Sequence, residues 1–165
     1  MAWRYQLSFT ALTGAVFCTI LLGIAMTDAR EYIIPDEFSL GGLALGIVAS
    51  TPGGVDGIGH AVVGAVFGFA LLWTVGAVGT RIFKEDAMGG GDIKLLAMIG
   101  AFLGWQSIFV TLFVGSVIGS LIGVALMLYE GADTKLAIPF GPFLAGGALV
   151  YLFFGDRILA FYLGV

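Results

Sequence analysis

Long apolar runs recur from one end of this sequence to the other, and the short segments between them carry nearly all of the charges. Of the 165 residues, 59% are hydrophobic and only 11% are charged, whereas a soluble domain carries about 25% charged residues. A chain of this composition cannot cover a water-facing surface with polar groups, so the lipid bilayer must be its solvent. The composition therefore excludes a soluble fold, and the absence of a basic run argues against nucleic acid as a partner.

The lengths of the apolar runs predict an all-α, polytopic membrane protein with about six transmembrane helices in a single domain, residues 1–165. A spanning helix needs about 20 apolar residues. The second and fourth runs are shorter than this, so either the bilayer must become thinner around them or flanking residues must complete the span. The predicted helices cover residues 7–27, 38–51, 58–83, 93–105, 108–129 and 140–154.

The basic residues predict how the chain is oriented in the membrane. If the predicted helices alternate in direction, the more charged connections share one side. The positive-inside rule places that side in the cytoplasm and both termini in the periplasm. The cytoplasmic side then holds Arg30, Arg81, Lys84, Lys94 and Lys135, and the other side holds Arg4 and Arg157.

Glycines at four-residue spacing occur in several predicted helices, for example Gly64 and Gly68. Small residues let helix backbones approach closely in lipid, where this contact supplies much of the attraction between helices. We interpret these glycines as contacts within the chain in preference to a dimer interface. The sequence does not fix the oligomeric state.

Two aspartates lie at the ends of predicted helices, where an ionisable residue of a membrane protein deserves a functional interpretation. Asp28 ends the first predicted helix and Asp92 begins the fourth. If the helices alternate, both carboxyl groups lie at the cytoplasmic face, where helix packing can bring them together. Two close carboxyl groups share one proton, so that one activates water while the other polarises a peptide carbonyl. This is the chemistry of an aspartic protease, and it requires no metal or cofactor.

Three consecutive glycines, residues 89–91, precede Asp92. Glycines allow positive φ and let a substrate backbone approach closely. The helix dipole stabilises an anion in the first turn, which favours Asp92 as the ionised member of the pair. The residues alone also fit a structural interpretation, in which Asp92 is only a helix N-cap and Asp28 pairs with Arg30 in a loop.

Residues 85–96, which read EDAMGGGDIKLL, resemble the GxGD motif region of the bacterial type IV prepilin peptidases, or leader peptidases. The segment 28–36 resembles the other signature of that family, an Asp seven residues before the proline of an Ile/Leu-Pro-Asp/Asn triplet. Here that proline is Pro35. Residues 138–143 are similar to the family's segment before its last helix, and residues 3–5 to the start of the peptidase half of its two-activity members. The resemblance therefore covers nearly the whole chain.

The resemblance implies a GxGD-type aspartic endopeptidase that cuts the leader peptide from prepilins or pseudopilins at the cytoplasmic face of the bacterial inner membrane. Its partners would be the prepilin substrate and membrane lipid. The two catalytic aspartates of the family map onto Asp28 and Asp92. Further residues that the resemblance implies in substrate binding or in shaping the site are Gly89, Gly91, Lys94, Pro35, Asp36 and Pro139.

Many members of that family also carry a cytoplasmic region with two Cys-x-x-Cys pairs, and they methylate the new N-terminus. This chain has one cysteine and no room for such a region. We therefore expect a peptidase-only form, or the peptidase half of a longer enzyme, and do not expect N-methylation by this chain.

Two alternatives of a different class remain. One is a small transporter or channel-like protein, because acidic residues at broken, glycine-rich helices also suit ion sites. The other is a noncatalytic scaffold for pilus assembly. A peptidase shortens a prepilin without any gradient across the membrane, whereas a transporter needs a gradient to act.

Overall fold

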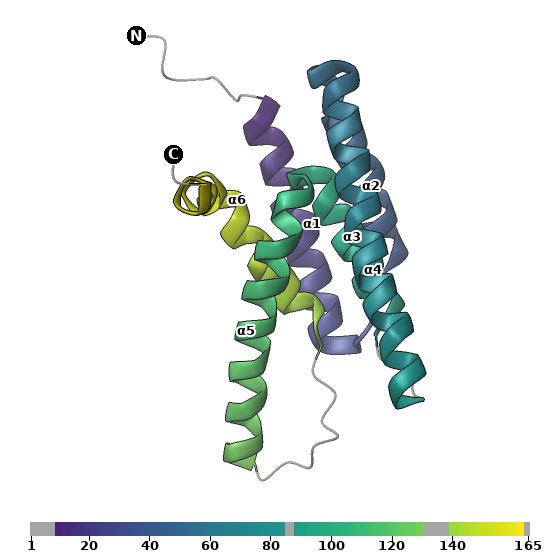
Figure 1. The fold of residues 1–165 in the computed structure, drawn as a ribbon, viewed down its shortest axis with the longest axis vertical. Helices are drawn as coiled ribbons and strands as arrows, with labels where there is room; N and C mark the ends of the chain where they lie inside the picture. Colours follow the sequence, from purple (N-terminus) through teal and green to yellow (C-terminus); the bar gives the residue numbers. More distant parts are fainter. Residues whose placement is uncertain (1–8, 85–87, 131–138, 164–165) are drawn as a thin grey trace.

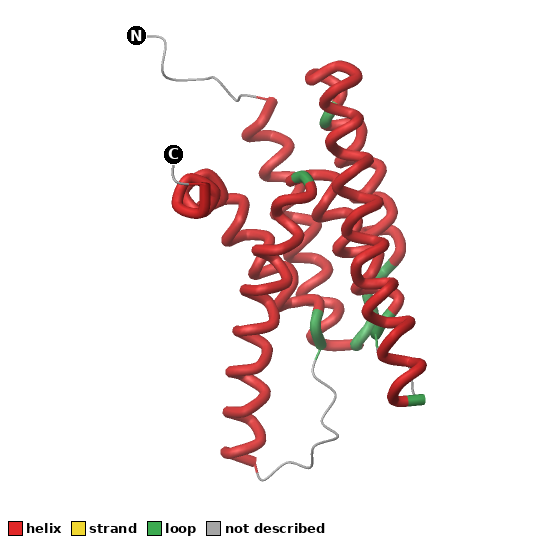
Figure 2. Tube along the Cα trace, in the orientation of Figure 1, coloured by secondary structure: helices red, strands yellow, loops and turns green. Residues whose placement is uncertain are grey.

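The structure, a computed structural model, describes residues 9–84, 88–130 and 139–163, and the regular elements of this part of the chain are all helices (Figures 1 and 2). The predicted all-α fold is therefore confirmed over these residues, and each predicted helix has a counterpart. In order, the elements are α1 (Phe9–Glu31), α2 (Asp36–Ala49), the 3₁₀ turn η1 (Thr51–Gly53), α3 (Gly54–Phe83), α4 (Gly90–Leu103), α5 (Trp105–Glu130) and α6 (Gly141–Leu163).

Fewer segments than predicted are long enough to cross a membrane on their own. Within the described ranges, four stretches qualify by length and composition: Phe9–Glu31, Asp36–Phe83, Trp105–Tyr129 and Gly141–Phe161. α2 and α4 have 14 residues each, which is short of the roughly 20 that a spanning helix needs. α2 and α3 contact each other as a helical hairpin that turns at η1 (Figure 1). A multi-pass membrane fold is supported, but six separate spans are not confirmed.

α4 lies inside the bundle, where it contacts α2, α3, α5 and α6. Every residue from Leu95 to Ala101 is buried. A helix that is apolar and buried on all sides has protein instead of lipid around it, so its length need not match the thickness of the bilayer. This enclosure explains how a 14-residue helix is accommodated, and it fixes the position of Asp92 in the first turn of α4.

α3 and α4 approach each other through glycines. A Cβ atom added to Gly64 would overlap the carbonyl oxygen of Gly100, and one added to Gly100 would overlap the carbonyl oxygen of Gly64. Gly68 faces the backbone of Leu96 in the same way. For these glycines, the predicted role in contacts within the chain is confirmed.

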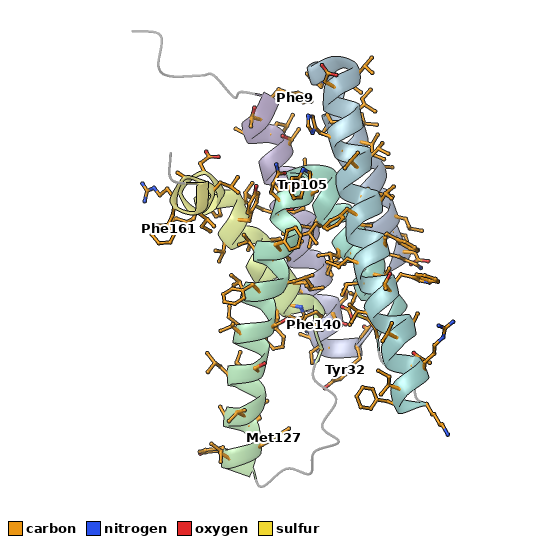
Figure 3. All side chains as sticks on the ribbon, in the orientation of Figure 1. Phe9, Tyr32, Trp105, Met127, Phe140 and Phe161 are labelled. Atoms are coloured by element: carbon orange, nitrogen blue, oxygen red, sulfur yellow. The ribbon has the colours of Figure 1, made fainter. Side chains whose placement is uncertain are left out.

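The two ends of the bundle carry different connections. Tyr32, just after α1, and Phe140, just before α6, lie toward one end of the molecule, while Phe9 and Trp105 lie toward the other (Figure 3). The end of α1 and the start of α6 therefore lie on the same side of the bundle, as predicted. Arg4 and Lys135, which entered the prediction of orientation, lie outside the described residues.

The outer surface of the helices is apolar. On α5, Leu121 is 67% exposed and Leu128 is 82% exposed. An exposed apolar surface of this extent is stable when lipid covers it and is an aggregation liability in water. The surface therefore agrees with the bilayer as the solvent of this protein.

Candidate active site

Asp28 projects from the last turn of α1 and is only 6% exposed. The first helix continues to Glu31, so the prediction that it ends at residue 27 is wrong and Asp28 is not in a loop. The structural alternative of a pair with Arg30 is also wrong, because the one ion pair within the described ranges joins Lys94 and Asp36. The Oδ2 atom of Asp28 instead accepts a hydrogen bond of 2.8 Å from the backbone N–H of Gly141.

Gly141 begins α6 and brings the N-terminus of that helix against Asp28. A Cβ atom at this position would lie 2.6 Å from Oδ2 and 3.1 Å from Cγ of Asp28, so no other residue type fits without displacement. The first N–H groups of a helix lack partners inside the helix and carry partial positive charge, and α6 therefore stabilises a negative charge on Asp28. Gly141 was not among the predicted site residues, whereas the neighbouring Pro139 was. The feature of the sequence that could have indicated Gly141 is a glycine in the first turn of the helix predicted over residues 140–154.

Asp92 lies in the first turn of α4, outside the four candidate spans. The N-cap of α4 is Gly89, and no side chain caps the helix, so Asp92 is not the capping residue that the structural alternative requires. Its Oδ1 atom is buried and has no hydrogen-bond partner among the described residues. Burial first, and then the negative charge of Asp28, raise the pKa of Asp92 to about 6.

The effect of Asp28 on the pKa of Asp92 makes the two carboxyl groups electrostatic neighbours, although they are 64 positions apart in the sequence. In such a pair the shared proton favours the carboxyl group that lacks hydrogen bonds, and the negative charge favours the one that accepts them. The arrangement favours a protonated Asp92 and an ionised Asp28. This is opposite to the expectation from the helix dipole of α4, because Asp28 accepts a hydrogen bond from Gly141 whereas Oδ1 of Asp92 has no partner among the described residues.

The two signature segments contact each other at Gly91 and Ile34. A Cβ atom on Gly91 would lie 2.8 Å from the Cβ atom of Ile34, which is itself buried. Residues 89–91 do not use the positive φ that glycine allows, since the glycines with positive φ in the described part of the chain are Gly54 and Gly104. Close packing against Ile34, and not an unusual backbone conformation, requires a glycine at position 91.

Lys94 and Asp36 join the starts of α4 and α2. The Nζ atom of Lys94 lies 2.5 Å from Oδ1 of Asp36, and Asp36 follows directly on Pro35, the N-cap of α2. All three residues are among the predicted site residues, but the pairing of Lys94 with Asp36 was not predicted. Since their side chains are 34% and 57% exposed, the pair contributes modestly to stability, and its main effect is to hold the two helix starts together beside Asp92.

In the described part of the chain, no cluster of three or more His, Cys, Asp or Glu side chains that could hold a metal ion occurs. The acidic side chains of this candidate site are Asp92, which is half-buried, and Asp28, whose carboxylate accepts a hydrogen bond from the N-terminus of α6. Fold and site together define a multi-pass α-helical membrane protein with an interacting pair of acidic residues at one end of its bundle.

The chain belongs to the type IV leader peptidase family, which it matches over residues 15–124. The resemblance that the motifs indicated is thereby confirmed. No solved structure gave a significant match to the chain.

Several curated relatives carry the name prepilin leader peptidase/N-methyltransferase. The chain is 38% identical over 160 residues to the protein of that name from Pseudomonas putida, covering 97% of this chain and 56% of the relative. It is 35% identical over 163 residues to that from Pseudomonas aeruginosa, with 99% and 56% covered. For the protein from Legionella pneumophila the identity is 31% over 163 residues, with 99% and 57% covered. The chain thus spans little more than half the length of these relatives.

Proposed function

We propose that this chain is an aspartic endopeptidase that removes the leader peptide from prepilins or pseudopilins, with Asp28 and Asp92 as its catalytic pair. Membership of the leader peptidase family supports a peptidase, and the names of the relatives support a prepilin as the substrate. The observation that carries the proposal is the contact of the two signature segments at Gly91 and Ile34. Together with the effect of Asp28 on the pKa of Asp92, it supports a joint role for the two acidic residues.

In the proposed reaction, ionised Asp28 accepts a proton from a water molecule whose oxygen attacks the carbonyl carbon of the scissile peptide. Asp92 donates its proton to the carbonyl oxygen, which gives a neutral tetrahedral intermediate. The proton on Asp28 then passes to the leaving nitrogen as the C–N bond breaks. One hydroxyl of the intermediate returns its proton to Asp92 as the new carboxylic acid forms. The pair thereby regains its initial protonation state.

The remaining site residues shape the surroundings of the pair. The N–H of Gly141 holds the carboxylate of Asp28, and the Lys94–Asp36 ion pair holds the starts of α2 and α4 together. The absence of a side chain at Gly91 leaves the space in which Ile34 packs against α4. Gly89 and Pro35 begin α4 and α2 as their N-caps, and Pro139 precedes the first turn of α6. We place the site at the cytoplasmic face of the inner membrane, with both termini in the periplasm.

Co-expression with a prepilin tests the proposal. Asp28→Asn and Asp92→Asn each remove one acid group at nearly constant size, so we expect the prepilin to stay uncut while the variant protein remains in the membrane. Asp56→Asn is the matched control, because Asp56 lies in the first turn of α3 and is exposed. Full processing by either catalytic variant would refute the assignment.

The same assay separates a peptidase from a transporter. A protonophore abolishes the gradient that a transporter requires, whereas hydrolysis of a peptide bond does not depend on it. We expect the wild-type protein to shorten the prepilin equally with and without the protonophore. Dependence of cleavage on the gradient would contradict the proposal.

A further inference from the structure

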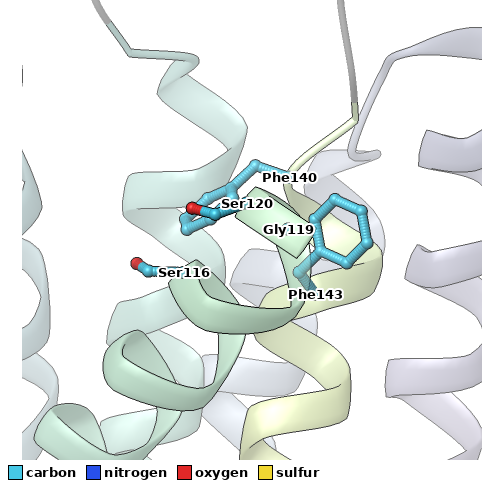
Figure 4. A pocket seen from close by; sticks show the side chains of 5 residues that line it. All are labelled: Ser116, Gly119, Ser120, Phe140 and Phe143. Atoms are coloured by element: carbon cyan, nitrogen blue, oxygen red, sulfur yellow. The ribbon is translucent and has the colours of Figure 1, made fainter. Parts of the chain in front are cut away.

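A pocket of about 280 Å³ opens between α5 and the start of α6 (Figure 4). Ligand pockets typically have volumes of about 300–1,000 Å³, so this one is large enough for a bulky side chain but not for a large molecule. Its wall consists of Ser116, Gly119, Ser120, Phe140 and Phe143.

Phe140 connects this pocket directly to the candidate active site. It immediately precedes Gly141, whose N–H holds the carboxylate of Asp28, and consecutive Cα atoms lie only about 3.8 Å apart. Phe143 lies one turn further along the same helix. The first turn of α6 therefore forms part of the pocket wall and also contacts Asp28.

The surroundings of the pocket indicate how an occupant reaches it. The neighbouring side chains on α5 are apolar and exposed: Val117 is 43% exposed and Leu121 is 67% exposed. In a membrane these side chains contact hydrocarbon, so an occupant approaches through lipid and must itself be largely apolar.

Ser116 and Ser120 are one helical turn apart on α5 and exposed. Neither hydroxyl forms a hydrogen bond with any described residue, whereas Thr74, on the exposed surface of α3, bonds the carbonyl oxygen of Ala70. A hydroxyl without a partner is costly in hydrocarbon. A peptide that is unwound for cleavage also lacks hydrogen-bond partners, because its N–H and C=O groups lose their bonds within the helix. The serine hydroxyls can supply partners to these backbone groups.

We propose that this pocket receives an apolar side chain of a membrane-embedded substrate segment near the scissile peptide, and that Ser116 and Ser120 bind the unwound backbone of that segment. This inference rests on the proposed peptidase function and adds a substrate-binding site to it. The pocket then selects substrates by the size of one apolar side chain. The two serines stabilise the extended backbone that the aspartates require.

Cleavage kinetics in proteoliposomes test the pocket with a synthetic peptide that spans a prepilin leader junction. Ser116→Leu and Ser120→Leu each fill the pocket and remove a hydroxyl, so we expect KM to rise about tenfold or more while kcat changes less than about twofold. The double variant Ser116→Ala with Ser120→Ala leaves the pocket open and should raise KM only about fivefold. Thr74→Leu, the same type of change on the exposed surface of α3, should alter neither constant. Unchanged KM in both leucine variants would overturn the inference.

Photocrosslinking tests the pocket independently of cleavage. The same peptide, with benzoylphenylalanine at successive positions around the junction, is bound to the Asp92→Asn protein and irradiated. We expect label on residues 116–120 or 140–143, and we expect excess unmodified peptide to suppress it. The inference would be overturned if the peptide labelled only residues outside the pocket. It would also be overturned if a photoreactive phospholipid labelled the pocket even in the presence of excess peptide. Specific labelling of the pocket without cleavage by the wild-type protein would instead contradict the proposed function alone.

Discussion

The N-terminus of α6 is fixed to α1 by a hydrogen bond between the backbone N–H of Gly141 and the carboxylate of Asp28, at 2.8 Å. The side chain that is proposed to activate water is therefore positioned by the backbone of another helix. Replacing another side chain cannot remove this donor, but an added Cβ atom at position 141 can displace it.

The first prediction follows from this contact. In Gly141→Ala, the new Cβ atom would lie 2.6 Å from Oδ2 of Asp28, so helix and carboxylate must separate. Because misplacement of a catalytic group by about 1 Å costs on the order of 100-fold in rate, we expect kcat to fall by about 10- to 100-fold. Gly146→Ala, on the same helix with no atom within 4 Å of the added Cβ, should keep full activity. Equal rates for the two variants would contradict the role of Gly141.

The second prediction concerns pH. The pKa of Asp92 is raised to about 6 by burial and by the charge of Asp28, and the proposed mechanism needs this group protonated. Activity is therefore present below the raised pKa and is lost as pH increases through it. We expect kcat/KM to decline by about tenfold per pH unit above that point. The Asp56→Asn control should show the same profile, and a constant kcat/KM between about pH 5 and 8 would exclude Asp92 as the acid.

The third prediction concerns the ion pair of Lys94 with Asp36. Since both side chains are partly exposed, we expect Lys94→Met or Asp36→Asn to lower kcat/KM only about threefold, in keeping with a contribution of at most about 1 kcal/mol. Exchanging the two residues, Lys94→Asp with Asp36→Lys, should restore part of the loss. A double-mutant cycle measures the coupling, and strictly additive losses would show that the pair does not act as a unit.

The fourth prediction concerns stability. Gly64→Ala places a Cβ atom against the carbonyl oxygen of Gly100, where neither backbone can move without separating α3 from α4. We expect the free energy of unfolding in detergent to fall by about 1–3 kcal/mol, measured as an earlier thermal transition. Gly59→Ala on the same helix has no atom within 4 Å of its Cβ. It should leave the transition unchanged or raise it slightly, because alanine favours a helix more than glycine does.

The apolar runs were sufficient to predict the helices of this fold, because hydropathy reports directly which residues avoid water. Their ends were predicted less well. Asp28 looked like the first residue after a helix because it is charged, yet packing against α6 keeps it within α1. The apolar runs also do not show which helices cross the bilayer. α4 is enclosed by other helices, and this enclosure depends on how the helices pack, which the sequence of a single run does not reveal.

Within the candidate site, the sequence identified the two aspartates but not the contacts that distinguish them. The hydrogen bond from Gly141 to Asp28 crosses 113 residues, and the ion pair of Lys94 with Asp36 crosses 58. Neither leaves a local pattern. The dipole of α4 favours an ionised Asp92, but burial and the charge of Asp28 both raise the pKa of Asp92, and neither effect can be read from the sequence.

The contact between Gly91 and Ile34 has a consequence for how such a protein can change. The side chain of Ile34 occupies the space that a methyl group on residue 91 would need. A larger residue at one of these positions therefore requires a smaller residue at the other. An alanine at position 91 would be tolerated only beside a smaller neighbour at position 34. We therefore expect the residues at positions 34 and 91 to vary together among proteins that share this packing.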